Sequence, residues 1–299
     1  MTYRGRFAPS PTGPLHFGSL IAATASYLQA RSQGGEWLVR MEDVDESRTR
    51  PGAADGILRT LEQYGFTWDG PIVVQTARKD RYRDALRRMI ARGFAYPCGC
   101  SRAETAGAPY PGTCRDGLPP GKRLRVWRLC TTGEAIGFED LVQGRQSMTM
   151  GGDFVLQRAD GLFAYQLAVV VDDADQQITE VVRGADLLDS TPRQIWLQRL
   201  LDLPAPSYVH IPAAVHANGQ KLSKQTMARP IAVEDPAPTL LAALNFLGQP
   251  AAAATSLGEI WERAIESWTV TSIPRVTRRL VSGGQIGSKP SRRAATFAM

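Results

Sequence analysis

Apolar and polar positions follow a regular order through the first third of this 299-residue chain. Apolar runs of strand length occur at 3–7 and 36–42, and helical composition or amphipathic spacing occurs at 18–31, 53–64 and 79–92. An order of strand, helix, strand and helix is typical of a parallel sheet with helical crossovers. The sequence therefore predicts an α/β fold whose ligands bind at the carboxyl ends of the parallel strands.

A different composition follows. Between 97 and about 160, glycine and proline are frequent, and only short strand-like runs occur, at 122–128 and 153–158. We expect a subdomain to be inserted there. The pattern of strands and helices resumes afterwards in the segments 165–175, 178–183, 191–203, 208–211, 237–247 and 257–268.

These shifts predict three parts: an α/β domain at 1–230 with the insertion at about 97–160, a helical region at 231–285, and a basic tail at 286–299 that we expect to be disordered. Six basic residues and no acidic residue lie at 275–299, which leaves 29 basic (35 − 6) and 29 acidic residues elsewhere. The net charge of +6 thus does not indicate a basic nucleic-acid-binding face on the body. The tail is either simply solvated or adds salt-dependent affinity for RNA phosphates.

The composition is that of an ordinary soluble protein, with 43% hydrophobic and 21% charged residues. Apolar runs such as 167–171 are far shorter than the roughly 20 residues that a membrane-spanning helix needs. No basic segment followed by an apolar stretch opens the chain, so we expect no secretory signal. We therefore expect a cytoplasmic protein with no membrane partner.

The segment 9–19, PSPTGPLHFGS, connects the first predicted strand to the first predicted helix. The first N–H groups of a helix have no partner within it, and the helix dipole favours negative charge there, so the turn is a candidate anion site. His16 lies just before the helix, where its ring could donate to a phosphate oxygen, and Gly18 permits close approach of a nucleotide. An isolated segment of this kind is also compatible with a solvated loop and an ordinary histidine.

The segment 221–225, KLSKQ, follows a turn-like stretch after the predicted strand at 208–211. A basic loop there could place Lys224 against the charge that develops on a transferring phosphoryl group, and such electrostatic stabilisation is often the largest catalytic contribution. Taken alone, the two lysines are compatible with a solvated surface.

The four cysteines lie in the predicted insertion or at its edge. Without an export signal, a disulfide framework is not expected. Clustered thiolates in a loop rich in glycine and proline are typical of a structural zinc site, although Cys98 and Cys100 are separated by one residue rather than two, and unligated cysteines remain the alternative. With Cys114 as the third ligand, the sequence leaves the fourth open among Tyr110, Cys130, Asp116 and water.

Five segments together resemble the catalytic body of the glutamyl-tRNA synthetases, which are class I synthetases. They lie at 6–19, 38–45, 165–173, 182–186 and 221–224. Segments 9–19 and 221–225 are similar to the two ATP-handling motifs of that class, HIGH and KMSKS. The resemblance implies a Rossmann-type parallel sheet, a zinc-bearing inserted subdomain and a small helical region that contacts an RNA stem.

Only 69 residues (299 − 230) follow the second motif region, and a separate anticodon-reading domain needs on the order of 100 or more. With its cysteines, the chain resembles the truncated paralogues called glutamyl-Q tRNA(Asp) synthetases. The resemblance implies that glutamate is activated by ATP without tRNA and is then esterified to the queuosine of the tRNA(Asp) anticodon. We expect a monomer. The alternatives are a glutamyl-tRNA synthetase fragment that charges the tRNA 3′ end and a catalytically silent tRNA-binding paralogue.

The resemblance also implies roles for residues at matching positions. Glutamate carries an ammonium group and two carboxylates. Glu42 would pair with the ammonium, and Arg6 and Arg183 would bind the carboxylates, because a guanidinium can bind a carboxylate through two hydrogen bonds. Tyr165 and Ser10 would orient the substrate. Without the resemblance, Glu42 could belong to an acidic turn and Arg183 to a structural ion pair.

For the other ligands, the resemblance implies contacts between ATP and Pro9, Gly18 and Lys224, with Mg²⁺ as the accompanying ion. The implied catalytic residues are His16, Ser19, Lys221 and Lys224, and the implied ligands of one structural zinc ion are Cys98, Cys100, Tyr110 and Cys114. Cys130 is then expected to be a core thiol.

The chain departs from the family pattern at two positions. Val169 stands where many glutamyl-tRNA synthetases carry asparagine, which predicts the loss of one polar contact to glutamate. Gln225 replaces the last residue of the second motif and leaves both lysines in place.

Overall fold

A computed structural model describes residues 2–106, 109–222, 229–250 and 256–281. Its first part contains the elements β1 (Arg4–Phe7), α1 (Phe17–Ser32), β2 (Glu36–Met41), α2 (Ala53–Gln63), β3 (Val73–Val74) and α3 (Lys79–Ala91). The strands β1, β2 and β3 pair in parallel in this order. The strand and helix pattern predicted for this part of the sequence is therefore confirmed.

The second parallel unit follows the insertion. It contains α4 (Tyr165–Asp175), β9 (Glu180–Gly184), α5 (Thr191–Leu201), β10 (Ser207–Ile211) and β11 (Ala213–Val215). β9 and β10 pair in parallel. The chain just before β9 lies beside β1, because the Thr179 N–H donates to the Arg4 carbonyl oxygen at 3.0 Å. The sequence predicted one parallel sheet, whereas two sheets meet here.

The predicted insertion is an antiparallel sheet of β4 (Ala95–Cys98), β5 (Val126–Leu129) and β8 (Phe154–Gln157). Between β5 and β8 the chain forms the hairpin of β6 (Ala135–Asp140) and β7 (Gly144–Thr149). This hairpin leaves the insertion and joins the second sheet, in the order β7-β6-β10-β9. The α/β architecture therefore has mixed sheets, and part of the predicted insertion belongs to the sheet beside the cleft described below.

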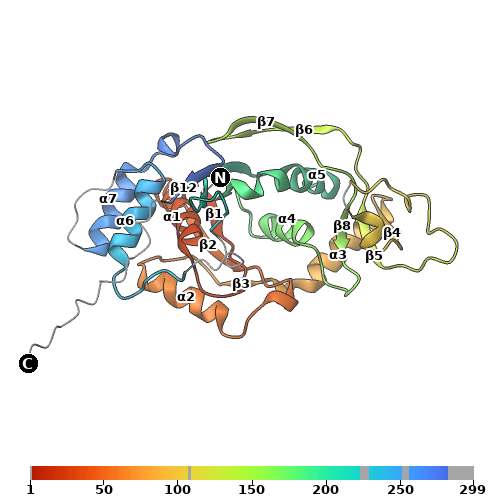
Figure 1. Ribbon diagram of the computed structural model, residues 1–299, viewed down its shortest axis with the longest axis horizontal. Coiled ribbons are helices and arrows are strands. Elements are labelled where there is room, and N and C mark those ends of the chain that lie inside the picture. The colour runs from red at the N-terminus through yellow and green to blue at the C-terminus, as the bar shows by residue number, and fades with distance from the viewer. Residues whose placement is uncertain (1, 107–108, 223–228, 251–255, 282–299) are drawn as a thin grey trace, which may run out of the picture.

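The C-terminal part contains α6 (Pro236–Phe246), α7 (Leu257–Ser267) and β12 (Arg278–Leu280), which pairs with β11. Both helices confirm the predictions for 237–247 and 257–268. Figure 1 shows α6 and α7 at one end of the molecule and β4, β5 and β8 at the opposite end. The predicted tail at 286–299 lies outside the described residues. Within the described ranges, we find no helix with both the length and the apolar character needed to cross a bilayer.

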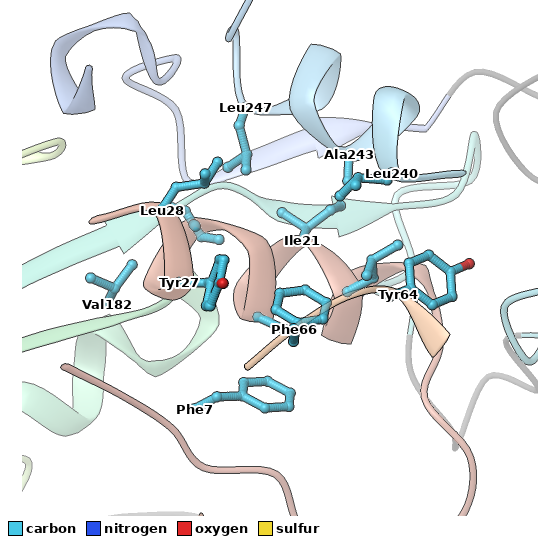
Figure 2. Close-up of a cluster of buried hydrophobic side chains, with 14 of the residues drawn as sticks. Phe7, Ile21, Tyr27, Leu28, Tyr64, Phe66, Val182, Leu240, Ala243 and Leu247 are labelled. Atoms are coloured by element: carbon cyan, nitrogen blue, oxygen red, sulfur yellow. The ribbon is translucent and has the colours of Figure 1, made fainter. Parts of the chain in front are cut away.

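The main core surrounds α1. Its residues Ile21, Tyr27 and Leu28 are at most 5% exposed, because α1 is covered by sheet strands on one side and by α6 and α7 on the other. Figure 2 shows these side chains beside Leu240, Ala243 and Leu247, with Phe7 and Phe66 also in the cluster. Since burial of each large apolar side chain contributes about 1.5–3 kcal/mol, this packing fixes α1 between the strands and the helices α6 and α7.

Candidate active site

A cleft of about 680 Å³ opens at the carboxyl ends of β1, β2 and β9, beside the start of α1. The parallel strands bring distant segments together there, because their carboxyl ends share one edge. The predicted residues that line it are Arg6, Pro9, Ser10, His16, Gly18, Ser19, Glu42, Tyr165, Arg183 and Lys221. Their chemical roles remain predictions. Lys224 lies at 223–228, outside the described residues.

His16 is the N-cap residue of α1. Its Nδ1 accepts the backbone N–H of Ser19 at 3.3 Å, and its Nε2 lies 3.2 Å from the Ser19 Oγ. Because Nδ1 accepts a hydrogen bond, the neutral ring carries its hydrogen on Nε2. The ring thus presents a donor at the positive end of a helix, a combination that suits a phosphate oxygen.

The two predicted ATP-handling segments lie against each other. A Cβ atom placed on Gly18 would lie 3.4 Å from the Leu222 carbonyl oxygen, an ordinary van der Waals distance, and 3.2 Å from the His16 ring, which is tighter than most real contacts. A larger residue than glycine would therefore crowd the His16 ring. Lys221 Nζ lies 2.5 Å from Asp186 Oδ2, so the described part of the second segment is linked to the loop that follows β9.

A buried group of charges surrounds two predicted glutamate-binding residues, Arg6 of β1 and Glu42, which directly follows β2. Asp173, in α4, lies 3.1 Å from Arg6 Nε and 2.7 Å from Arg40 Nη2, and Arg40 Nη2 is also 3.4 Å from Glu42 Oε1. The Arg40 side chain is 0% exposed and the Glu42 side chain 8%. Burial raises the pKa of Glu42, while the charges of Arg40 and Arg6 oppose this shift.

Arg183, in β9, also lines the cleft. Its Nη1 donates to Gln194 Oε1 at 2.8 Å and its Nη2 to Thr191 Oγ1 at 2.9 Å. A longer contact of 3.5 Å joins Nη1 to the hydroxyl of Tyr165. Arg183 is 5% exposed in a polar setting and lines the same cleft as Glu42 and Arg6. The arrangement has the charges needed for a ligand with one ammonium group and two carboxylates.

The sequence did not identify Arg40 and Asp173 as parts of the site. A signal for both was present, because each charge stands in or directly after an apolar run, WLVRM in β2 and LAVVVDD in α4. A charge in such a run is buried when the strand or helix forms, and a buried charge needs a partner. Arg40 and Asp173 are that pair, and they connect Arg6 to Glu42.

Comparison with known proteins gives the family. The family model of the catalytic domain of tRNA synthetases class I (E and Q) matches residues 2–106 and 120–263. The glutamyl-Q tRNA(Asp) synthetase of Dechloromonas aromatica is 56% identical over 91% of this chain and 96% of that protein. That of Geobacter sulfurreducens is 58% identical over 82% of this chain and 84% of that protein. The chain belongs to the glutamyl-Q tRNA(Asp) synthetase family. It is thus a member of the aminoacyl-tRNA synthetases, which are ligases.

A solved structure agrees on the fold of this family member. The crystal structure of glutamate-tRNA synthetase from Elizabethkingia anophelis superposes with a TM-score of 0.82 at 24% identity, covering 96% of this chain and 69% of that one. The class I synthetase catalytic fold expected from the sequence is therefore confirmed.

Three cysteines of this family member could hold a metal ion. The sulfur atoms of Cys98, Cys100 and Cys114 lie within 4.8 Å of one another, and those of Cys100 and Cys114 are 3.7 Å apart. The Tyr110 hydroxyl lies 3.4 Å from the sulfur of Cys98 and 3.5 Å from that of Cys100. A tetrahedral zinc ion with Zn–S bonds of about 2.3 Å places sulfur atoms about 3.8 Å apart, so the spacing fits.

Arg128 and Cys130 also lie near this group. Arg128 Nε donates to the sulfur of Cys98 at 3.4 Å, and although burial opposes ionisation, this and other hydrogen bonds leave the pKa of Cys98 below its usual value. Cys130, expected in the core, is only half-buried, because it follows the last residue of β5 where the chain leaves the sheet.

Val169 is fully buried in the apolar cluster between α3, α4 and α5.

A second cleft of about 1010 Å³ adjoins the first. The two clefts share five lining residues: Ser10, Thr12, Glu42, Arg48 and Tyr165. The second cleft extends along the insertion past Cys100, and arginines are frequent in its lining: Arg48, Arg102, Arg125, Arg128 and Arg158. A negatively charged ligand in this cleft would therefore reach the predicted glutamate pocket.

Proposed function

We propose that this protein activates glutamate with ATP in the absence of tRNA and transfers the glutamyl group to the queuosine of the tRNA(Asp) anticodon. The observation that carries the proposal is a single cleft with Arg6, Glu42 and Arg183 at the strand ends and the start of α1 beside them, in a member of this family. Glutamate needs the three charges, and a nucleotide phosphate suits the helix start.

In the proposed ground state, Glu42 accepts hydrogen bonds from the substrate ammonium, and Arg6 and Arg183 bind the two carboxylates. Tyr165 and Ser10 orient the substrate from the cleft wall. Because Arg6 and Glu42 are both tied to the buried Arg40 and Asp173, their geometry is set before the substrate arrives. Such preorganisation lowers the cost of aligning the reacting groups.

In the activation step, an oxygen of the α-carboxylate attacks the α-phosphorus of ATP, and pyrophosphate leaves along the opposite direction. His16 and the first N–H groups of α1 donate to phosphate oxygens. Pro9 and Gly18 contact the nucleotide, and Ser19 stays beside the His16 ring. Lys221 and Lys224 add positive charge where the transition state gains negative charge. Mg²⁺ bound with the nucleotide would neutralise further phosphate charge.

The decisive experiment separates the two half-reactions. Purified protein should catalyse pyrophosphate exchange that depends on glutamate and needs no tRNA. Labelled glutamate should then attach to tRNA from cells that make queuosine, at the anticodon by nuclease mapping, and not to tRNA from cells that lack it. Attachment at the 3′ end of tRNA(Glu) would favour a fragment of an ordinary synthetase, and absence of any adenylate would favour a silent paralogue.

The RNA acceptor enters through the second cleft in this proposal, because that cleft opens onto Glu42 and Tyr165. We expect Arg102→Glu and Arg125→Glu to lower kcat/KM for tRNA about tenfold each and to reduce its salt dependence, because both side chains are exposed and positioned for phosphates. Glutamate-dependent pyrophosphate exchange should not change. Arg59→Glu, an exposed arginine of α2, is the control. Equal transfer by all three variants would contradict this path.

The structural metal is proposed to be zinc, held by Cys98, Cys100, Cys114 and the hydroxyl of Tyr110. We expect about one zinc ion per purified chain in the wild type. Cys98→Ser should bind close to none, because a structural zinc site is held by four protein ligands and this variant lacks one of them. Cys130→Ser should keep its zinc, and Tyr110→Phe should bind it more weakly in competition with a chelator. Equal metal content in Cys98→Ser and Cys130→Ser would remove Cys98 from the site.

The helical region 231–285 is proposed to contact the RNA stem. A cytoplasmic location and a monomeric state stay predictions from the sequence.

A further inference from the structure

Three buried side chains on neighbouring strands form a continuous hydrogen-bonded chain that ends in the cleft. Asp140 is the last residue of β6, and His210 in β10 lies directly opposite Arg183 of β9 in the parallel register. His210 Nδ1 is 2.6 Å from Asp140 Oδ2, and Arg183 Nε is 3.0 Å from His210 Nε2. The side chains of Asp140 and His210 are 0% exposed. None of the roles proposed above uses Asp140 or His210.

The outer groups determine the state of the imidazole between them. A guanidinium has only donors and an ionised carboxylate has only acceptors. Burial raises the pKa of Asp140, but hydrogen bonds from His210 and Gln143 outweigh this effect and hold it below its usual value. His210 must therefore carry its hydrogen on Nδ1 and accept the Arg183 N–H on Nε2. Burial also lowers the pKa of His210, which favours this neutral ring.

The same hydrogen bond determines how the Arg183 guanidinium is turned. With Nε bonded to His210, the two terminal nitrogens bond Gln194 and Thr191 at 2.8 and 2.9 Å. Each terminal nitrogen also has one long contact, of 3.5 Å to the Tyr165 hydroxyl and 3.4 Å to the Leu187 carbonyl oxygen. These two long contacts are the ones that an incoming carboxylate can replace, one on each nitrogen. A carboxylate that replaced both contacts would be bound at two points by the guanidinium.

We propose that Asp140 and His210 are positioning residues, which hold the Arg183 guanidinium so that both terminal nitrogens address a carboxylate of glutamate. The proposal rests on the assignment of Arg183 to glutamate under the proposed function. Asp140 selects the tautomer of His210. The lone pair on Nε2 of that tautomer accepts the Arg183 Nε–H and so fixes the guanidinium. Asp140, one of these two positioning residues, thus lies in the β6–β7 hairpin, within the predicted insertion.

Two substitutions of His210 separate positioning from structural support. Asparagine can keep the donor near the position of Nδ1 and so satisfy Asp140, but it offers no acceptor at the position of Nε2. Glutamine can keep an acceptor near Nε2 and loses the donor to Asp140. We expect His210→Asn to raise the KM for glutamate in pyrophosphate exchange about tenfold or more, the scale typical of lost outer-shell hydrogen bonds. The KM for ATP should stay within about twofold, and His210→Gln should retain most of the affinity for glutamate.

Tyr208→Phe is the matched control. It removes a buried hydroxyl from the same strand, bonded to Gln198, and keeps the ring that lies near Arg183. It should not change the KM for glutamate. Equal effects of His210→Asn and His210→Gln, or equal changes in the KM values of glutamate and ATP, would overturn the proposal while the glutamate-activating function stands. An unchanged KM for glutamate in Arg183→Gln would overturn both this proposal and the assignment of Arg183.

The wild-type protein offers a test that does not depend on the folding of any variant. The chain has 3 histidines, so the ring nitrogens of His210 can be resolved and assigned by ¹⁵N NMR. We expect a neutral ring with its hydrogen on Nδ1 at about pH 7. A ring protonated on both nitrogens, or with its hydrogen on Nε2, would overturn the proposal.

Discussion

Replacement of Glu42 by glutamine is expected to lower kcat/KM for glutamate in pyrophosphate exchange about a hundredfold. The change keeps the shape of the side chain and removes the charge that pairs with the substrate ammonium. Hydrogen bonds to charged groups contribute about 1.5–3 kcal/mol, and a buried charge left without its partner costs more. At about 1.4 kcal/mol for each factor of ten, a hundredfold loss corresponds to about 2.8 kcal/mol.

Glutarate sharpens this test, because it has both carboxylates of glutamate and no ammonium group. As a competitive inhibitor, it should bind the Glu42→Gln variant at least as tightly as the wild type, since no buried carboxylate opposes it. Asp43→Asn is the control from the same acidic stretch, where Asp43 bonds only Thr76 among the described contacts. A parallel loss of glutamate and glutarate affinity would show that Glu42 supports the fold instead of the substrate.

The pH dependence of glutamate binding follows from the same carboxyl group. Burial raises the pKa of Glu42 above its usual value, and Arg40 and Arg6 oppose that shift. A protonated carboxyl cannot pair with an ammonium group, so the affinity for glutamate should fall as the pH falls through this pKa. The Glu42→Gln variant has no group to titrate there, and its KM profile should be flatter on the acid side.

Much of the fold could be predicted because its signals are local. The apolar runs at 3–7 and 36–42 form β1 and β2, and the turn between them starts a helix at Phe17, one residue from the predicted position. The residues of the candidate site were predicted from the family resemblance, because the resemblance assigned Arg6 and Arg183 to one ligand. Both line one cleft, as the expected parallel strands allow, since their carboxyl ends share one edge.

Pairings across long sequence distances could not be predicted in the same way. Nothing in the segment 135–149 indicates that it leaves the insertion to join β10, because strand pairing depends on a partner about seventy residues away. The Asp140 carboxylate contributes to that pairing through the backbone N–H of His210, at 3.1 Å. The partners of Arg40 likewise come from α4, so only the tertiary fold reveals that its charge is balanced.

The second large effect is expected at Arg40, where substitution by methionine should lower the free energy of unfolding by about 3–5 kcal/mol. The guanidinium is fully buried and joins Asp173, Gln176 and Glu42, so its removal leaves carboxylates buried without their nearest cation. Total stabilities are about 5–15 kcal/mol, so the variant should be only marginally folded. Urea unfolding followed by circular dichroism measures the difference. Arg87→Met, which breaks an exposed pair with Asp84, should cost less than about 1 kcal/mol.

The pH dependence and a double variant show whether the cost is electrostatic. Burial raises the pKa of Asp173, but the charges of Arg6 and Arg40 outweigh it and lower the pKa. A carboxyl whose folded pKa lies below its unfolded value of about 3.9 stabilises the fold above that pH and loses this contribution as the pH falls through the folded pKa. The deficit of Arg40→Met should therefore shrink on acidification. Asp173→Asn combined with Arg40→Met should be less destabilised than the sum of the single variants, because the uncompensated charge is gone. An additive double variant with a deficit that is independent of pH would mean that Arg40 stabilises the fold through packing alone.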